Sequence, residues 1–133
     1  GKEMQRLDWT AIDLADGFIE VRGATSKTGV RRLVPIKANL KAWLTKLQPA
    51  NQSGPVCKYK NLANEIFELS TASGVTWKRN GLRHSFISYR VAECADVPRV
   101  ADEAGNSVTV IRTNYLRRVK PAQAAEWFGI LPS

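Results

Sequence analysis

The stretch RNGLRHSFISYRVAECADVPRVADEAGNSVTVIRTNYLRR, residues 79–118, decides the fold that the sequence predicts. Its apolar residues recur at helical spacing in three runs, and turn or cap residues separate the runs. The first run begins near Asn80 and extends to about Cys94, with Leu82, Phe86 and Ile87 on its expected buried side. This part of the chain is therefore expected to be helical throughout.

The second and third helices of this stretch carry clear boundary residues. Asp96 followed by Pro98 is typical of a helix start, and Gly105 is typical of a helix end. Ser107 can cap the next helix, on which Val108, Ile111 and Tyr115 share one face. Gly105, Asn106 and Ser107 thus form a short turn between two helices.

Outward from this stretch, the N-terminal part predicts a small antiparallel sheet. The opening residues predict a short helix with Met4, Leu7 and Trp9 on one side, and a short strand is expected at 11–14. Residues 18–21 alternate as a half-buried strand, and residues 32–36 return as its partner, with Pro35 restricting that partner to an edge or an end.

Three longer helices are expected outside residues 79–118, besides the short one at the opening residues. The first covers about 37–48, with an apolar face formed by Leu40, Trp43, Leu44 and Leu47. The second covers about 61–72, with Leu62, Ile66 and Leu69 on its buried side, and Gly74 breaks it. The third opens at Pro121 and runs through Trp127 and Phe128, which could pack on their own domain or dock onto a neighbouring subunit.

The fold class is therefore α+β and mainly α, with about six helices and one small sheet near the N-terminus. A length of 133 residues, 44% of them hydrophobic, fits a single globular domain covering 1–133. Twenty Lys and Arg residues against twelve Asp and Glu residues give a net charge of +8, which favours a polyanionic partner. No apolar run approaches the roughly 18 residues of a membrane span, so we expect a soluble, cytoplasmic protein with no membrane partner.

Metal and disulfide chemistry have little support in the sequence. Cys57 and Cys94 lie 37 positions apart, the chain has no CxxC pair, and His84 is its only histidine. These residues favour neither a zinc site nor a disulfide framework.

Two residues of the stretch 79–118 suggest chemistry on a phosphodiester. The phenol of Tyr115 is a usable nucleophile, and the guanidinium of Arg83 can bind a phosphate with two parallel hydrogen bonds. The blocks Asn80-Gly81-Leu82-Arg83-His84, Gly105-Asn106-Ser107 and Tyr115 resemble, in order and spacing, the C-terminal signature of the tyrosine recombinases, the phage-integrase family. Arg83 to Asn106 is 23 positions and Asn106 to Tyr115 is 9, as in that signature.

The resemblance implies a catalytic domain that cleaves and rejoins DNA through a 3′-phosphotyrosyl intermediate, without a metal or nucleotide cofactor. Tyr115 would attack phosphorus, and Arg83 would neutralise the phosphate oxygens. Lys27, five positions before the run Arg32-Leu33-Val34-Pro35-Ile36, would be the general acid on a hairpin tip, although a solvated turn lysine is the alternative. Asn80 and Asn106 stand where the family generally has histidine, and an amide cannot carry a proton at neutral pH.

Other basic residues are candidate contacts to the DNA backbone. A rim of basic residues gives an affinity for DNA that does not depend on the DNA sequence. For each single residue, the alternative is a solvated surface charge. His84 has a packing role as its alternative. These candidates are Arg31, Lys78, Arg79, His84, Arg112, Arg117 and Arg118.

The N-terminus carries a further part of the resemblance. Glu3, Leu7 and Trp9 fit a family pattern whose catalytic arginine would fall one position before Gly1. We therefore expect a truncated chain that lacks this arginine and the family's core-binding domain, and that is inactive alone. The expected partner is double-stranded DNA, with a monomer in isolation and a tetramer of the parent protein on paired sites.

Two alternatives stay open. One is a degenerate integrase-like module that binds DNA without cutting it, which the two asparagines favour. The other is a basic protein-interaction domain whose resemblance to the family is accidental.

Overall fold

The computed structural model describes residues 2–23 and 31–133, and cap residues explain several helix boundaries in these ranges. The Asn61, Asp96 and Ser107 side chains accept hydrogen bonds from the first turns of the helices that follow them, as N-caps do. Gly74 and Gly105 end helices with φ of 69° and 67°, a left-handed conformation that glycine adopts without steric cost. The predicted boundaries at these five residues are confirmed.

The described residues form a mainly helical α+β domain with seven α-helical segments, rather than about six, and a three-stranded antiparallel sheet. The predicted count of about six corresponds to α2 to α7, and the predicted short helix at the opening residues is the seventh, α1. The segments are α1 (Lys2–Arg6), η1 (Trp9–Ala11), β1 (Ile12–Asp13), β2 (Phe18–Arg22), β3 (Arg31–Pro35), α2 (Ala38–Leu47), α3 (Leu62–Ser73), α4 (Gly81–Cys94), α5 (Val97–Ala104), α6 (Val108–Val110), η2 (Ile111–Tyr115) and α7 (Pro121–Phe128).

The sheet has the order β1-β2-β3, with β2 in the centre. In β2 and β3, Ile19 pairs with Val34 and Arg22 with Arg31. Pro35 therefore lies on an edge strand, as predicted, since proline has no backbone N–H to donate to a neighbouring strand. The predicted hairpin tip that carries Lys27 lies outside the described residues.

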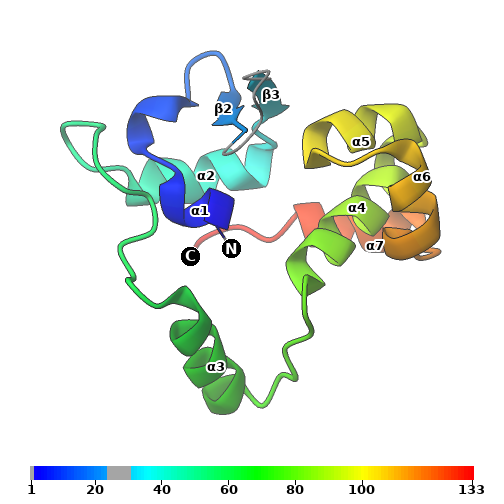
Figure 1. Cartoon of the computed structure of the whole chain (residues 1–133). Coiled ribbons are helices and arrows are strands. Elements are labelled where there is room, and N and C mark those ends of the chain that lie inside the picture. The colour runs from blue at the N-terminus through cyan, green and yellow to red at the C-terminus, as the bar shows by residue number, and fades with distance from the viewer. Residues whose placement is uncertain (1, 24–30) are drawn as a thin grey trace.

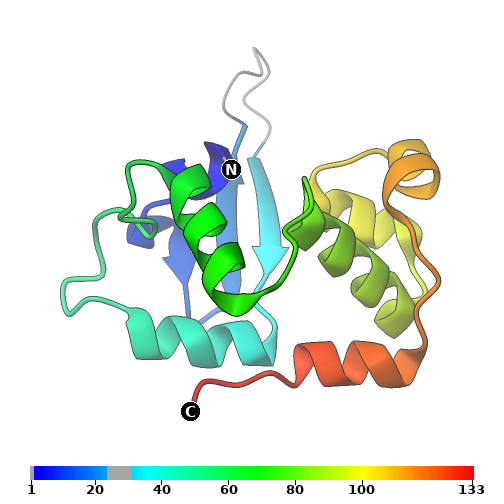
Figure 2. The ribbon, with the colours of Figure 1, turned by 90° about the horizontal axis from the view of Figure 1, so that it is seen from below.

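Two halves face each other in the molecule (Figure 1). The sheet half contains α1, η1, the sheet and α2, and the helical half contains α4 to α7. The residues after α7 return to the sheet half (Figure 2), where Trp43 Nε1 donates to the Ile130 carbonyl at 3.2 Å and Lys46 bonds the carbonyl of Ser133.

The core of the helical half includes Ile87, Val100 and Ile111, all with no exposed surface. Val108 and Tyr115 pack against this cluster together with Ile111, so the predicted shared face is confirmed. Trp127 stacks on Tyr89 with ring centroids 4.7 Å apart. The last helix thus packs on its own domain.

Several burial predictions are wrong although the helices are right. Leu47, Leu69 and Leu82 are 65%, 59% and 54% exposed, and within α2 only Leu44 is buried. Helix α3 has no buried residue and stands apart from both halves in Figure 1, so Leu62 and Ile66 are only half-buried. Met4 is also exposed, whereas Trp9 is buried. Periodicity identifies the apolar face of a helix but not whether another element covers it.

Candidate active site

The turn between α5 and α6 brings two of the predicted blocks together. Arg83, in the first turn of α4, donates from Nη1 to the Asn106 side-chain oxygen at 2.9 Å and to the Ala104 carbonyl at 3.1 Å. These residues are separated by more than twenty positions in the sequence, so tertiary packing creates the contact. Because the Asn106 oxygen accepts from Arg83, its NH₂ group is the end that can donate to a phosphate.

The next residue of α4 contacts the predicted nucleophile. The rings of His84 and Tyr115 lie 4.5 Å apart, tilted by 45°. Tyr115 is half-buried and ends the π-helical turn η2, a rare element that often occurs at functional sites. The packing role of His84, named above as the alternative to a DNA contact, thus has a defined partner.

The backbone around Tyr115 is held by one buried hydroxyl. Ser88 is 4% exposed, and its Oγ donates to the Tyr115 carbonyl at 3.2 Å and accepts from the Arg117 N–H at 3.1 Å. Helix α4 therefore positions Arg83 through its first turn and Tyr115 through His84 and Ser88. Sequence reasoning missed Ser88, because a serine in the middle of an apolar run carries no local signal of its partners.

The remaining candidates lie around this centre or outside it. Asn80 is the exposed N-cap of α4 at φ 55°, a conformation that asparagine tolerates, and makes no side-chain cap bond. Lys27 lies outside the described residues. Arg31 forms an ion pair with Glu20 at 3.3 Å. The other basic candidates are exposed, and they are Lys78, Arg79, Arg112, Arg117 and Arg118.

Glu3 connects the site to the sheet half. Its carboxylate accepts two hydrogen bonds of 3.2 Å from Arg32, and Arg83 Nη2 lies 3.8 Å away. The bonds from Arg32 hold the pKa of Glu3 below its ordinary value; burial opposes this shift, and the charges of Arg32 and Arg83 add to it. Glu3 is therefore an anion at neutral pH, in contact with two cations.

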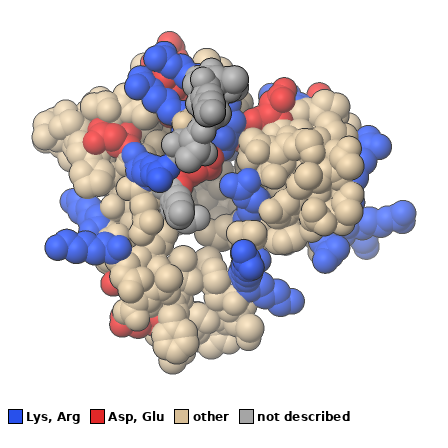
Figure 3. All heavy atoms as spheres, viewed as in Figure 1, with Lys and Arg blue, Asp and Glu red and all other residues tan. Residues whose placement is uncertain are grey.

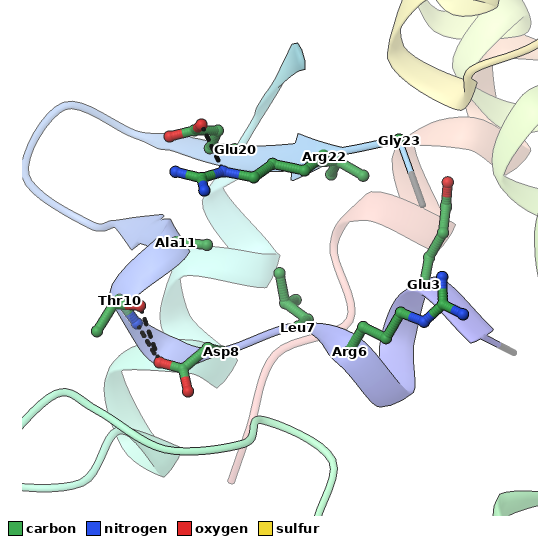
Figure 4. A pocket seen from close by; sticks show the side chains of 10 residues that line it. Glu3, Arg6, Leu7, Asp8, Thr10, Ala11, Glu20, Arg22 and Gly23 are labelled. Atoms are coloured by element: carbon green, nitrogen blue, oxygen red, sulfur yellow. Dashed lines mark hydrogen bonds and ion pairs between the residues drawn. The ribbon is translucent and has the colours of Figure 1, made fainter. Parts of the chain in front are cut away.

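Glu3 also lines a groove of about 540 Å³ between α1, η1 and β2. Figure 4 shows Arg6 beside Glu3 on α1, and Glu20 paired with Arg22 on β2. Both signs of charge line this groove, so the groove itself does not select an anionic ligand.

Lys and Arg side chains are scattered over the face seen in Figure 3, with fewer Asp and Glu side chains among them. The face is hollowed where the sheet half, the helical half and α3 meet, and Lys and Arg side chains lie along its rim as well as on its outer edges. Such a distribution suits a polyanion more than a small anion.

No protein-family model, curated protein or solved structure matches the chain. The contacts described above and the sequence pattern therefore carry the functional inference. Among residues 2–23 and 31–133, no group of three or more His, Cys, Asp and Glu side chains could hold a metal ion. Within the same ranges, no helix has the length and apolar character needed to span a bilayer.

Proposed function

We propose that the chain is the catalytic domain of a tyrosine recombinase, which cleaves and rejoins double-stranded DNA through Tyr115. One observation carries the proposal. The guanidinium of Arg83 contacts Asn106 of the second sequence block, and its neighbour His84 contacts Tyr115 of the third. Three blocks that are distant in sequence thus gather around the first turn of α4.

In this mechanism each side chain has a distinct task. The phenol of Tyr115 gives up its proton to water and forms a bond to phosphorus, while the bond from phosphorus to the 5′ oxygen breaks and that oxygen takes a proton from a general acid, for which Lys27 is the candidate. Arg83 and the Asn106 NH₂ group stabilise the charge that grows on the phosphate oxygens. The phosphotyrosyl bond conserves the energy of the broken bond, so rejoining needs no cofactor.

A covalent trapping experiment tests the proposal. The longest natural form of the chain is incubated with a pool of nicked duplexes of random sequence, in which the cleaved end diffuses away. A protein–DNA adduct that survives denaturation is expected, and Tyr115→Phe should abolish it. Tyr59→Phe is the matched control, because Tyr59 is 58% exposed in the loop before α3 and should leave adduct formation unchanged.

The absence of any adduct in the pool would contradict cleavage and favour a module that only binds DNA. Asn80 and Asn106 favour that second candidate, because neither amide can transfer a proton. Replacing both, Asn80→His with Asn106→His, distinguishes the two functions. Recovery of the adduct only in the double variant would identify a DNA-binding relative that has lost cleavage.

A further inference from the structure

Two guanidinium groups from different halves of the molecule reach one carboxylate. Arg32, on the edge strand β3, donates from Nη1 and Nη2 to the two carboxylate oxygens of Glu3, each at 3.2 Å. Arg83, on α4, approaches the same carboxylate to 3.8 Å. Glu3 thus takes the position of an oxyanion bound between two arginines.

The C-terminal end of α5 holds both arginines independently of Glu3. Arg32 Nε donates to the Glu103 carbonyl at 3.4 Å, and Arg83 Nη1 donates to the Ala104 carbonyl at 3.1 Å. Gly105 permits the close approach of Arg32, since a Cβ at that position would lie 2.7 Å from Arg32 Nη1. Both cations are therefore oriented before any ligand arrives.

Glu3, in contrast, is held weakly. Its side chain is 47% exposed, against 23% for Arg32 and 36% for Arg83. An exposed side chain can turn away into water at little cost, because it buries little surface. Of the three side chains, Glu3, Arg32 and Arg83, it is therefore Glu3 that can move away from the other two.

We propose that Arg32 and Arg83 form a two-arginine phosphate site, and that the Glu3 carboxylate is its internal occupant, displaced when a phosphate group binds. A fork of N–H donors fits a phosphate as well as a carboxylate, and a phosphate carries more charge into the site. The recombinase resemblance assigns no role to Arg32. The inference rests on the proposed function in one respect: the phosphate group that binds in the cell is taken to belong to DNA.

Titration with inorganic phosphate at constant ionic strength tests the site in the full chain. The side-chain Nε–H resonances of Arg32 and Arg83 report binding by NMR. Both are expected to shift, and Glu3→Gln should tighten phosphate binding about tenfold, because it removes a charged competitor. Glu126→Gln is the matched control: it removes one negative charge from the exposed face of α7 and should change the affinity less than about twofold.

Arg32→Lys provides a second arm, because lysine keeps the charge and loses the fork. It should weaken phosphate binding at least about fivefold. Equal phosphate affinities of the Glu3→Gln and Glu126→Gln variants would overturn the inference. An Arg32 Nε–H resonance that does not shift on phosphate addition would overturn it as well. If Arg32→Lys unfolds, which its melting temperature will reveal, the Glu3→Gln arm still decides.

The outcome is separable from that of the trapping experiment. Phosphate binding that responds to Glu3→Gln without any Tyr115 adduct would support the site and contradict recombinase activity. An adduct together with a phosphate affinity that Glu3→Gln leaves unchanged would support the activity and contradict the site.

Discussion

Glu103 is a buried carboxylate whose charge is matched by a buried arginine. Both it and Arg90 are 7% exposed, and two hydrogen bonds of 2.9 Å join them. Glu103→Gln would leave the Arg90 charge buried without its full partner, so we expect a loss of about 3 kcal/mol in the free energy of unfolding. Urea denaturation followed by circular dichroism measures this loss.

Glu93→Gln is the control for this prediction. Glu93 also contacts Arg90, at 2.8 Å, but its side chain is 33% exposed. Water can replace part of that contact, so the expected loss is about 1 kcal/mol or less. Equal losses in the two variants would show that burial does not govern the cost.

The stabilisation that Glu3 contributes to the fold should depend on pH. The hydrogen bonds from Arg32 lower its pKa below the ordinary value of 4.5, so the folded state favours the charged form. The stabilisation is complete above that value and disappears as the pH falls through the lowered folded-state pKa. Wild type and Glu3→Gln should therefore differ in melting temperature at pH 7 and converge in acid; a constant difference down to about pH 2 would contradict the assignment.

At the scale of single residues, the sequence predicts local roles and misses distant partners. Asp96 and Ser107 were predictable as caps, because a cap bonds residues two or three positions away. The contacts of Glu3 with Arg32 and Arg83 were not predictable, since they join three elements. The resemblance uses Glu3 as a pattern position only, and the structure adds its partners.

At the scale of elements, two glycines form a matched pair. Gly105 and Gly74 both end helices at nearly equal φ, but a Cβ would collide with Arg32 only at Gly105 and would meet nothing within 4 Å at Gly74. Gly74→Ala should cost about 1 kcal/mol from backbone strain alone. Gly105→Ala should cost about 1 kcal/mol more, because the Arg32 guanidinium must also move.

Thermal unfolding of the two glycine variants measures both costs. Equal losses would indicate that Arg32 moves aside freely and is not oriented by the turn. In that case the preorganised site proposed for Arg32 and Arg83 would also lose its support.

Element boundaries were largely predictable, whereas burial was not. The predicted ranges 37–48 and 61–72 nearly coincide with α2 and α3. The π-helical turn η2 was predicted only as ordinary helix, because a single turn of five residues is too short to show a different apolar period. The exposure of Leu69 depends on where α3 lies in space, which no pattern within α3 records.

At the scale of the whole molecule, the net charge of +8 predicts salt-dependent binding to duplex DNA. Each phosphate contact contributes about −0.9 to the slope of log affinity against log salt concentration. Replacing Arg117 and Arg118 with glutamine should therefore make the slope shallower by about 1.8. Fluorescence anisotropy with a labelled duplex measures it.

The double variant Lys58→Gln with Lys60→Gln is the control. It removes the same charge from exposed positions outside the predicted contacts, and should leave the slope nearly unchanged. A wild-type affinity that does not vary with salt would favour the basic protein-interaction domain over both DNA-dependent functions.

The return of the chain after α7 has a consequence for how the protein tolerates breakage. Residues 71–80 are all exposed and form a natural target for proteases. A single nick there would not separate the two fragments, because the Trp43–Ile130 bond and the Lys37–Glu93 ion pair still tie them together. The molecule should thus survive as a non-covalent complex of two pieces, and could be rebuilt by mixing them.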